Sequence, residues 1–247
     1  MKVLVAIPSY NRPYTIEKRT GFWVKKLKDI DYKVFVREDQ YLYYNQVFSA
    51  DHLVEINVNS YRETINAIRD YAIKNGYDLI HKFDDDMSFK RLGMAKKSDA
   101  HEVYKQLYAD VVNCFMQDPD LYGVSVAKPM NHIRNKDTQF TRLNKCLYGN
   151  MWLRPDIMYM PEGIELLDDV WNTLNILKLG KKTASYTLAY EDAELLKNDG
   201  GLQSIDRNKA TKETIDVMSK YFDNVRVGSY KGNSEILDID LKHLGIK

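Results

Sequence analysis

The sequence predicts an α/β fold, a single domain with a mainly parallel sheet sandwiched by helices. Through the first 130 positions, short apolar runs alternate with helical segments of about 10 to 16 residues, a pattern typical of parallel strands joined by crossover helices. The 247 residues suffice for one large core, and 44% hydrophobic and 29% charged residues are ordinary globular usage. Because no repeat, low-complexity tract or linker rich in Pro, Gly and Ser interrupts the chain, we expect residues 1–247 to form one domain.

Apolar runs and helical spacing assign the elements in order. We expect strands over 3–7, 33–36, 53–58, 79–83 and 122–127, with helices over 13–28, 40–49, 62–74 and 100–117 between them. In the third helix, Ile65, Ile68 and Ala72 recur on one face, which predicts the side that packs on the sheet. A polar, basic and aromatic stretch then breaks the pattern. Beyond it we expect helices over 169–179 and 211–221 and strands over 184–189 and 224–227.

Charge, hydropathy and cysteine usage exclude several classes of protein. The 36 basic and 35 acidic residues give a net charge of +1, so any affinity for nucleic acid must come from a local patch. No apolar run approaches the roughly 18 to 20 residues of a membrane-spanning helix, and Met1-Lys2 leads directly into the first strand, so we expect a cytoplasmic protein with no membrane partner. Cys114 and Cys146 lie outside any CxxC motif and predict reduced thiols. The oligomeric state is not predicted.

The strongest chemical signal is the acidic triplet Asp84-Asp85-Asp86, which follows an apolar strand directly. Adjacent carboxylates at the end of a buried strand repel one another and lose hydration, and a divalent cation would offset both effects. Because alternate strand residues point to one side, we expect Asp84 and Asp86 to reach one ion and Asp85 to face elsewhere. Hard oxygen ligands suit Mg²⁺ or Mn²⁺ carrying a diphosphate. The alternative is an acidic turn that caps the next helix.

Polar residues also follow the first two strands. The run Ile-Pro-Ser-Tyr-Asn-Arg ends the first strand, and ligands of open α/β sheets bind beyond the carboxyl ends of strands. In this run, Tyr10 offers a ring face to a base and Arg12 a fork to a phosphate. Glu38 follows the second strand, and Arg69 lies on the helix before the triplet. The alternative for the first run is ordinary turn and N-cap chemistry.

Taken together, these motifs resemble the nucleotide-sugar half of GT-A glycosyltransferases. The resemblance rests on the Ile-Pro-Ser-Tyr-Asn-Arg run, Glu38-Asp39, the Ala67-Ile68-Arg69-Asp70 segment and the triplet. Asp168-Asp169, followed by a helix that ends at Gly180-Lys181-Lys182, resembles the acidic pair that presents the acceptor-side carboxylate in that fold. More narrowly, over roughly residues 1–230, the chain is similar to the TET/JBP-associated glycosyltransferases of bacteriophages, which are thought to attach sugars to hydroxymethylated pyrimidines in phage DNA.

The resemblance implies a metal-dependent glycosyltransferase, with a nucleotide-sugar half over about 1–130 and an acceptor half over about 131–247. Mn²⁺ or Mg²⁺ would bind Asp84 and Asp86. Asp169, or in second place Asp168, which stands where many relatives have Glu, would accept the proton of the acceptor hydroxyl. A UDP-sugar would be held by Pro8, Tyr10, Asn11, Arg12, Glu38, Arg69, Asp84 and Asp85. The candidates for a last metal ligand are His132, Asp192 and His243, and none stands out.

The acceptor is predicted from the stretch 131–154. It carries five basic residues against one acidic residue, with aromatic residues interleaved: Arg134, Lys136, Arg142, Lys145 and Arg154, Asp137, and Phe140, Tyr148 and Trp152. Basic groups for phosphates and rings for stacking favour a DNA groove. The implied acceptor is 5-hydroxymethylcytosine or a related hydroxymethylpyrimidine in phage DNA, modified in the host cytoplasm. The alternatives are a solvated loop, a saccharide, lipid or protein acceptor, a nucleotidyltransferase, and a DNA-binding module without turnover.

Overall fold

The computed structural model describes residues 1–91, 99–127, 139–141, 147, 149–193, 207–223, 225–230 and 234–239. Its strands are β1 (Val3–Pro8), β2 (Tyr32–Arg37), β3 (Leu53–Ile56), β4 (Leu79–Lys82), β5 (Met87–Lys90), β6 (Leu121–Ala127), β7 (Phe140–Thr141), β8 (Met151–Leu153), β9 (Lys182–Ala193), β10 (Val225–Tyr230) and β11 (Ser234–Ile239). Its helices are α1 (Pro13–Lys18), α2 (Thr20–Val24), α3 (Tyr41–Tyr44), α4 (Tyr61–Lys74), α5 (Ala100–Gln117), α7 (Asp168–Lys178) and α8 (Arg207–Tyr221), with short 3₁₀ turns η1 (Glu38–Gln40) and η2 (Ala50–His52).

A nine-stranded sheet forms the centre of the molecule, in the order β3-β2-β1-β4-β8-β6-β9-β5, with β7 paired to β9. The pairs β1–β2, β1–β4, β2–β3 and β6–β9 are parallel. Because β8 is antiparallel to both β4 and β6, those two strands run the same way. The predicted mainly parallel sheet is therefore confirmed, with β5, β7 and β8 reversed.

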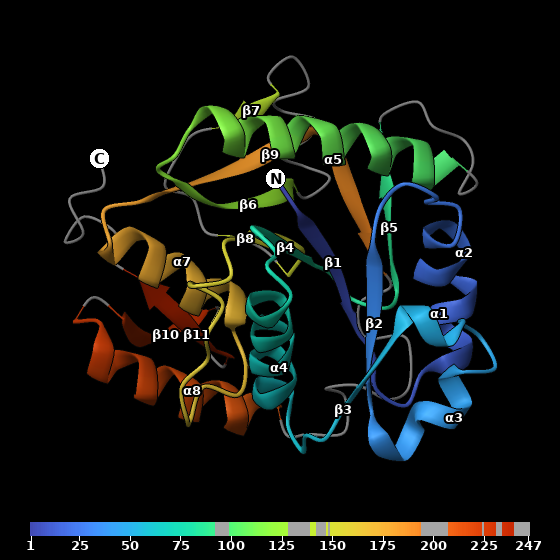
Figure 1. Ribbon diagram of the computed structural model, residues 1–247. Coiled ribbons are helices and arrows are strands. Elements are labelled where there is room, and N and C mark those ends of the chain that lie inside the picture. Colours follow the sequence, from blue (N-terminus) through green and yellow to red (C-terminus); the bar gives the residue numbers. More distant parts are fainter. Residues whose placement is uncertain are drawn as a thin grey trace.

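Helices cover both faces of this sheet. Apolar side chains of β1 point alternately to the two faces, so each face has a core on which helices pack. Val3, Val5 and Ile7 face a core shared with α2 and α5, whereas Leu4 and Ala6 face a second core shared with α4, α7 and α8. In Figure 1, α5 lies above the sheet and α1 to α3 lie at its right, while α4, α7 and α8 lie at the lower left. This arrangement confirms the predicted sandwich.

Local signals fix the ends of the helices that flank the carboxyl edge of the sheet. Ser60 caps α4 by accepting a hydrogen bond from the Glu63 amide at 3.2 Å, and the Glu63 carboxylate accepts one from the Asn59 amide at 2.6 Å. Gly180, with φ of 68°, follows the end of α7, where a residue with a Cβ atom would be strained. The first turns of α4 and α7 lie beside the end of β4, because Tyr61 of α4 and Lys82 of β4 both donate to Asp168 Oδ2 of α7.

Several predicted elements differ from the structure. The helix predicted over 13–28 divides at Arg19, whose φ of −114° and ψ of −99° are not helical, and the helix predicted over 40–49 is a 3₁₀ turn followed by the four residues of α3. Strands β5, β7 and β8 are too short for a periodic signal, so they were not predicted. The last predicted strand, β10, pairs with β11 outside the main sheet.

Candidate functional site

Polar side chains gather at the carboxyl edge of the sheet. The loop after β1, the turn after β2 and the acidic triplet after β4 all leave the sheet at this edge, because β1, β2 and β4 are parallel neighbours. Open α/β sheets bind ligands beyond this edge. We therefore take it as the candidate functional site.

Asp85 joins the first loop to the triplet. Its side chain is buried and accepts hydrogen bonds from Ser9 Oγ at 2.5 Å and Arg12 Nη1 at 3.2 Å. Tyr44 of α3 completes the group, since its hydroxyl oxygen lies 2.7 Å from Ser9 Oγ and accepts from the Arg12 amide at 3.0 Å. Burial raises the pKa of Asp85 to about 6, although the Ser9 hydrogen bond and the Arg12 charge both lower it. Asp85 therefore holds the first loop against the triplet.

Asp84 and Asp86 face different partners. Arg12 Nη1 lies 3.8 Å from an Asp86 carboxylate oxygen, whereas Asp84 Oδ1 lies 3.3 Å from Lys82 Nζ. The sequence predicted that Asp84 and Asp86 share one side and that Asp85 faces elsewhere. The triplet instead forms a turn beyond the end of β4, so strand alternation no longer applies, and it is Asp85 and Asp86 that share Arg12.

Lys82, which the sequence reasoning missed, lies beneath this edge. It is the last residue of β4 and is buried, and its Nζ lies 3.3 Å from both Asp84 Oδ1 and Asp168 Oδ2. It also donates to the Gly149 carbonyl at 3.2 Å. Burial alone would lower the pKa of Lys82, but the charges of Asp168 and Asp84 outweigh it, so the pKa is raised well above its usual value. The available signal was a lysine inside an apolar strand, two residues before an aspartate.

Asp168 lies within this group and Asp169 has its own local partners. Asp168 is buried in the first turn of α7, and its Oδ2 also accepts a hydrogen bond from the Tyr61 hydroxyl at 3.1 Å. Burial and the charge of Asp168 raise the pKa of Tyr61 well above its usual value, so the phenol remains a donor. Asp169 Oδ1 accepts from the Val170 amide at 2.8 Å. Of the two predicted candidates, Asp168 is the one that shares a partner with the triplet.

Backbone strain also lies at this edge. Asn11 and Leu167, with φ of 57° and 61°, are the two residues other than glycine with positive φ in the described chain. Asn11 is in the first loop and Leu167 directly precedes α7. Asparagine tolerates this conformation, whereas leucine does so at a cost of about 1 to 3 kcal/mol, and such strain tends to occur at functional sites.

The other predicted residues of the first two loops lie around the same edge. Pro8 ends β1, Tyr10 is exposed, and the Arg37 guanidinium carbon lies 4.8 Å from the centre of the Tyr10 ring. The Asn11 amide donates to Gln40 Oε1 at 2.6 Å, which ties the first loop to the η1 turn that carries the exposed Glu38.

Arg69 lies farther from this edge. It is eight residues beyond Tyr61 in α4, which places it about 12 Å along the helix axis from the first turn. Its Nη1 pairs with Asp70 at 2.8 Å, and its guanidinium carbon lies 5.5 Å from the centre of the Tyr159 ring. Its described contacts do not bring it to the triplet, so its role in donor binding stays a prediction.

The donor set at the edge fits a hard divalent cation in part. The Asp84 side chain is 51% exposed, and a Cβ atom built on Gly149 would lie 3.9 Å from Asp84 Oδ2, so the glycine leaves room beside that carboxylate. Asp86 supplies further carboxylate oxygens. Within the described residues no group of three or more His, Cys, Asp or Glu side chains could hold a metal. A cation here would therefore take its remaining ligands from a diphosphate and water.

The stretch 131–154 lies largely outside the described residues, and so do His132 and His243. Three of its basic and aromatic residues are described, and the first of them, Phe140, is partly buried with its ring 5.4 Å from that of Tyr186. Trp152 is buried, with its ring 4.0 Å from that of His81, and the Arg154 guanidinium stacks near the Tyr122 ring at 5.0 Å. Trp152 fills the core because β8 is an interior strand of the sheet, and Arg154 directly follows β8. A fully buried Trp152 cannot stack on a base, so its predicted part in DNA binding was wrong, whereas the parts predicted for Phe140 and Arg154 stay predictions.

Asp192, a predicted candidate for the last metal ligand, pairs with a lysine. Lys90 Nζ lies 2.8 Å from Asp192 Oδ2, and the Ser88 hydroxyl donates to the same oxygen at 3.4 Å. Both partners come from β5, the edge strand that pairs with the end of β9. No described contact joins Asp192 to the triplet.

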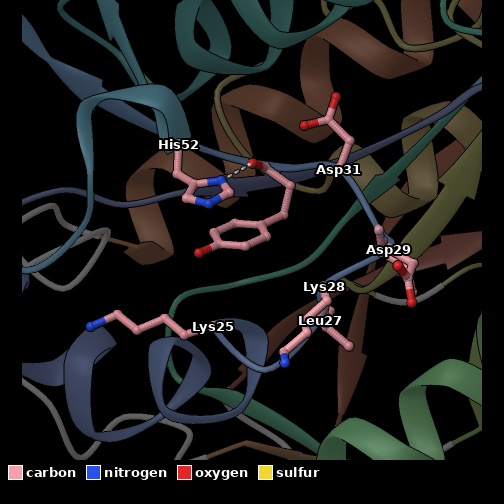
Figure 2. Close-up of a pocket in the computed structure, with 8 residues that line it drawn as sticks. Lys25, Leu27, Lys28, Asp29, Asp31 and His52 are labelled. Atoms are coloured by element: carbon pink, nitrogen blue, oxygen red, sulfur yellow. Dashed lines mark hydrogen bonds between the residues drawn. The ribbon is translucent and has the colours of Figure 1, made fainter.

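A separate pocket of about 580 Å³ opens at the opposite end of β2, where that strand begins. Figure 2 shows His52 on the upper side of this pocket, Lys25 and Lys28 on the lower side, and Asp29 and Asp31 at the right. His52 Nδ1 lies 3.1 Å from the Tyr32 carbonyl, and the two rings stack at 3.9 Å. Because it lies at the amino end of the strands, this pocket is distinct from the candidate site.

Comparisons with known proteins find similarity in structure alone. No protein-family model and no curated protein sequence matches the chain. Glucosyl-3-phosphoglycerate synthase from Mycobacterium tuberculosis, solved with Mg²⁺ and UDP, superposes with a TM-score of 0.53 at 11% identity, over 96% of this chain and 86% of that one. GalNAc-T7, solved with UDP, GalNAc and Mn²⁺, has a TM-score of 0.52 at 9% identity, over 78% of this chain and 44% of that one.

These similarities define the fold of the chain as GT-A-like, the fold of nucleotide-sugar transferases. The sequence resemblance to GT-A enzymes therefore holds at the level of the fold. No comparison shows the narrower link to bacteriophage enzymes. No helix in the described ranges is both long and apolar enough to span a membrane.

Proposed function

We propose that this protein is a metal-dependent glycosyltransferase that takes its sugar from a UDP-sugar. The observation that carries the proposal is that the acidic triplet and the first turn of α7, more than 80 residues apart, meet on one buried ammonium, that of Lys82. One carboxylate beside this ammonium, that of Asp84, is partly open to solvent, and the other, that of Asp168, is buried. Asp84 therefore suits a group on the side of the donor, and Asp168 suits a group on the side of the acceptor.

The residues divide between donor and acceptor. Asp84 and Asp86 would hold Mn²⁺ or Mg²⁺, which would offset negative charge on the departing diphosphate. Arg12, already oriented by Asp85, would contact a phosphate, and the exposed Tyr10 would offer its ring to the base. Glu38, Asn11 and Pro8 complete the predicted donor loops.

In an inverting transfer, the acceptor oxygen forms a bond to the anomeric carbon while the bond from that carbon to the diphosphate oxygen breaks. The hydroxyl proton passes to a carboxylate, which we assign to Asp168 ahead of Asp169 because Asp168 shares Lys82 with Asp84. The similar folds of proteins solved with UDP and a divalent cation support the donor class.

For the acceptor we propose a hydroxymethylpyrimidine in DNA, supported by the motif resemblance and by the basic residues of the stretch 131–154. Arg134, Lys136, Arg142 and Lys145 remain as candidates for phosphate contacts. A hydroxymethyl base inside a duplex would have to leave the base stack to reach a carboxylate at the sheet edge.

The test incubates the protein with Mn²⁺, a panel of UDP-sugars, and DNA with or without 5-hydroxymethylcytosine, followed by nucleoside mass spectrometry. A mass increase of one sugar, lost with EDTA and in Asp86→Ala, is the expected result. Release of UDP without DNA modification would leave the proposal of a transferase standing and reject DNA as its acceptor. Absence of both sugar transfer and UDP release across the panel would reject the proposed function.

A further inference from the structure

Lys82 is positioned to act on both sides of the candidate site. Its ammonium donates hydrogen bonds to Asp168 Oδ2 and the Gly149 carbonyl and forms an ion pair with Asp84 Oδ1, so three oxygen atoms contact it. These acceptors come from the turn after β4, the first turn of α7 and the segment that leads into β8. Two carboxylates and one carbonyl therefore compensate the charge of the ammonium, although the side chain is buried.

Asp84 presents its two oxygens to different surroundings. Oδ1 pairs with the Lys82 ammonium, whereas Oδ2 lies on the side of Gly149, 3.9 Å from where a Cβ atom on that glycine would stand. A cation that takes Oδ2 would therefore share one carboxylate with a permanent positive charge. Lys82 orients the ligand and at the same time repels the ion that the ligand would bind.

We propose that Lys82 is a positioning residue that orients Asp168 and Asp84 from one ammonium and that weakens metal binding until a diphosphate supplies compensating charge. The inference rests on the proposed function, since it assigns the metal to Asp84 and the acceptor to Asp168. It predicts that the metal binds tightly only with the donor, so that the ion and the nucleotide enter the site together.

Two opposing effects decide what happens when Lys82 is removed. A unit charge within about 4 to 6 Å shifts the pKa of a neighbouring carboxylate by about 1 to 3 units. The equivalent change in the affinity of that carboxylate for a cation is roughly ten- to thousand-fold. Holding one short ligand side chain in a single orientation raises the metal affinity by less, under about tenfold. Repulsion therefore outweighs orientation, and we expect Mn²⁺ to bind at least about threefold more tightly to Lys82→Met. A lysine with a merely structural role would weaken metal binding, or leave it unchanged, when removed.

The experiment measures free Mn²⁺ by electron paramagnetic resonance during titration of the full chain, with and without UDP. Lys82→Met and Lys82→Gln should both tighten Mn²⁺ binding in the absence of UDP. Both variants should also reduce the factor by which UDP raises the Mn²⁺ affinity. Lys181→Met is the matched control, because Lys181 pairs with Asp120 at 2.7 Å beyond the amino end of β9, and it should leave Mn²⁺ affinity unchanged.

A third variant keeps the test decisive if neither Lys82 variant folds. Asp168→Asn leaves the ammonium with Asp84 as its one described carboxylate partner, so Mn²⁺ binding should weaken several-fold. In transfer assays the Lys82 variants should lose at least about tenfold in kcat with no rise in donor KM, because Asp168 loses its orienting partner.

The outcomes separate this proposal from the proposed function. Mn²⁺ affinity in the Lys82 variants that equals or falls below that of the wild type would overturn the role of Lys82 and leave the transferase standing. Where those variants do not fold, wild-type affinity in Asp168→Asn would do the same. The predicted shifts in Mn²⁺ affinity without sugar transfer or UDP release from any donor would reject the transferase and leave the role of Lys82 toward the metal. If the wild type binds no Mn²⁺ with or without UDP, both fall.

Discussion

His81 should make the stability of this protein depend on pH. It precedes Lys82 in β4 but points to the opposite face of the sheet, where its ring stacks on Trp152 at 4.0 Å and on Tyr104 at 5.5 Å. Burial lowers the pKa of His81 well below 6.5. Its described partner is the Tyr104 hydroxyl, 2.8 Å from Nδ1, and no carboxylate of the described chain contacts the ring.

The sign of the effect follows from the two states. Well above pH 6.5 the imidazole is neutral in the folded and the unfolded chain, so it contributes no pH dependence there. Below that value the unfolded chain takes up a proton that the buried ring does not, so the free energy of unfolding falls. With an unfolded pKa of about 6.5, the loss between about pH 8 and pH 5 is at most roughly 2 kcal/mol, the value reached when the folded ring takes up no proton.

The measurement is urea unfolding followed by tryptophan fluorescence across this pH range. His81→Phe/Tyr104→Phe removes both partners of the buried hydrogen bond, and the decrease contributed by His81, at most roughly 2 kcal/mol, should disappear from its pH profile. His52→Phe is the control for loss of a histidine, since His52 is partly exposed at the amino end of the sheet. Identical pH profiles for wild type and the double variant would refute the reasoning.

Three further predictions concern the site and its support. Asp86→Asn should weaken Mn²⁺ binding in the presence of UDP by at least about tenfold with little change in melting temperature, and an unchanged calorimetric titration would remove Asp86 from the metal site. Ser9→Ala should cost about 1 to 3 kcal/mol in urea unfolding, because Tyr44 and Asp85 lose a buried partner; a loss within experimental error would contradict this. Gly21→Ala places a Cβ atom 2.7 Å from the Ile16 carbonyl oxygen and should cost about 1 to 3 kcal/mol, whereas wild-type stability would show that α1 and α2 shift freely.

Strong periodic signals made most of the sheet predictable. The first four strands and the helices α4 and α5 follow from apolar runs and helical faces, which depend on neighbours in sequence. The reversed strands β5, β7 and β8 have four, two and three residues, and their pairing depends on partners far along the chain. No local pattern specifies such pairing.

The location of the site in the sheet was more predictable than the contacts among its residues. Sheet topology places the first loop and the triplet at one edge, as expected for residues that follow parallel strands. The division of the triplet between Arg12 and Lys82 was not predictable, because the chain turns immediately after β4. The partnership of Lys82 with Asp168 depends on how α7 packs, and packing over that separation leaves no trace in local sequence.

The insertion of β8 between β4 and β6 affects how the chain must be assembled. Strands β1 to β4 are made first, but the free edge of β4 finds its partner only when β8 has been synthesised, with Ile80 opposite Leu153 and Lys82 opposite Met151. Until then an apolar strand edge is open to pairing with another chain, which is a route to aggregation. An N-terminal fragment that stops before β8 would carry this open edge permanently. We therefore expect a smaller protein that contains only the donor loops to aggregate.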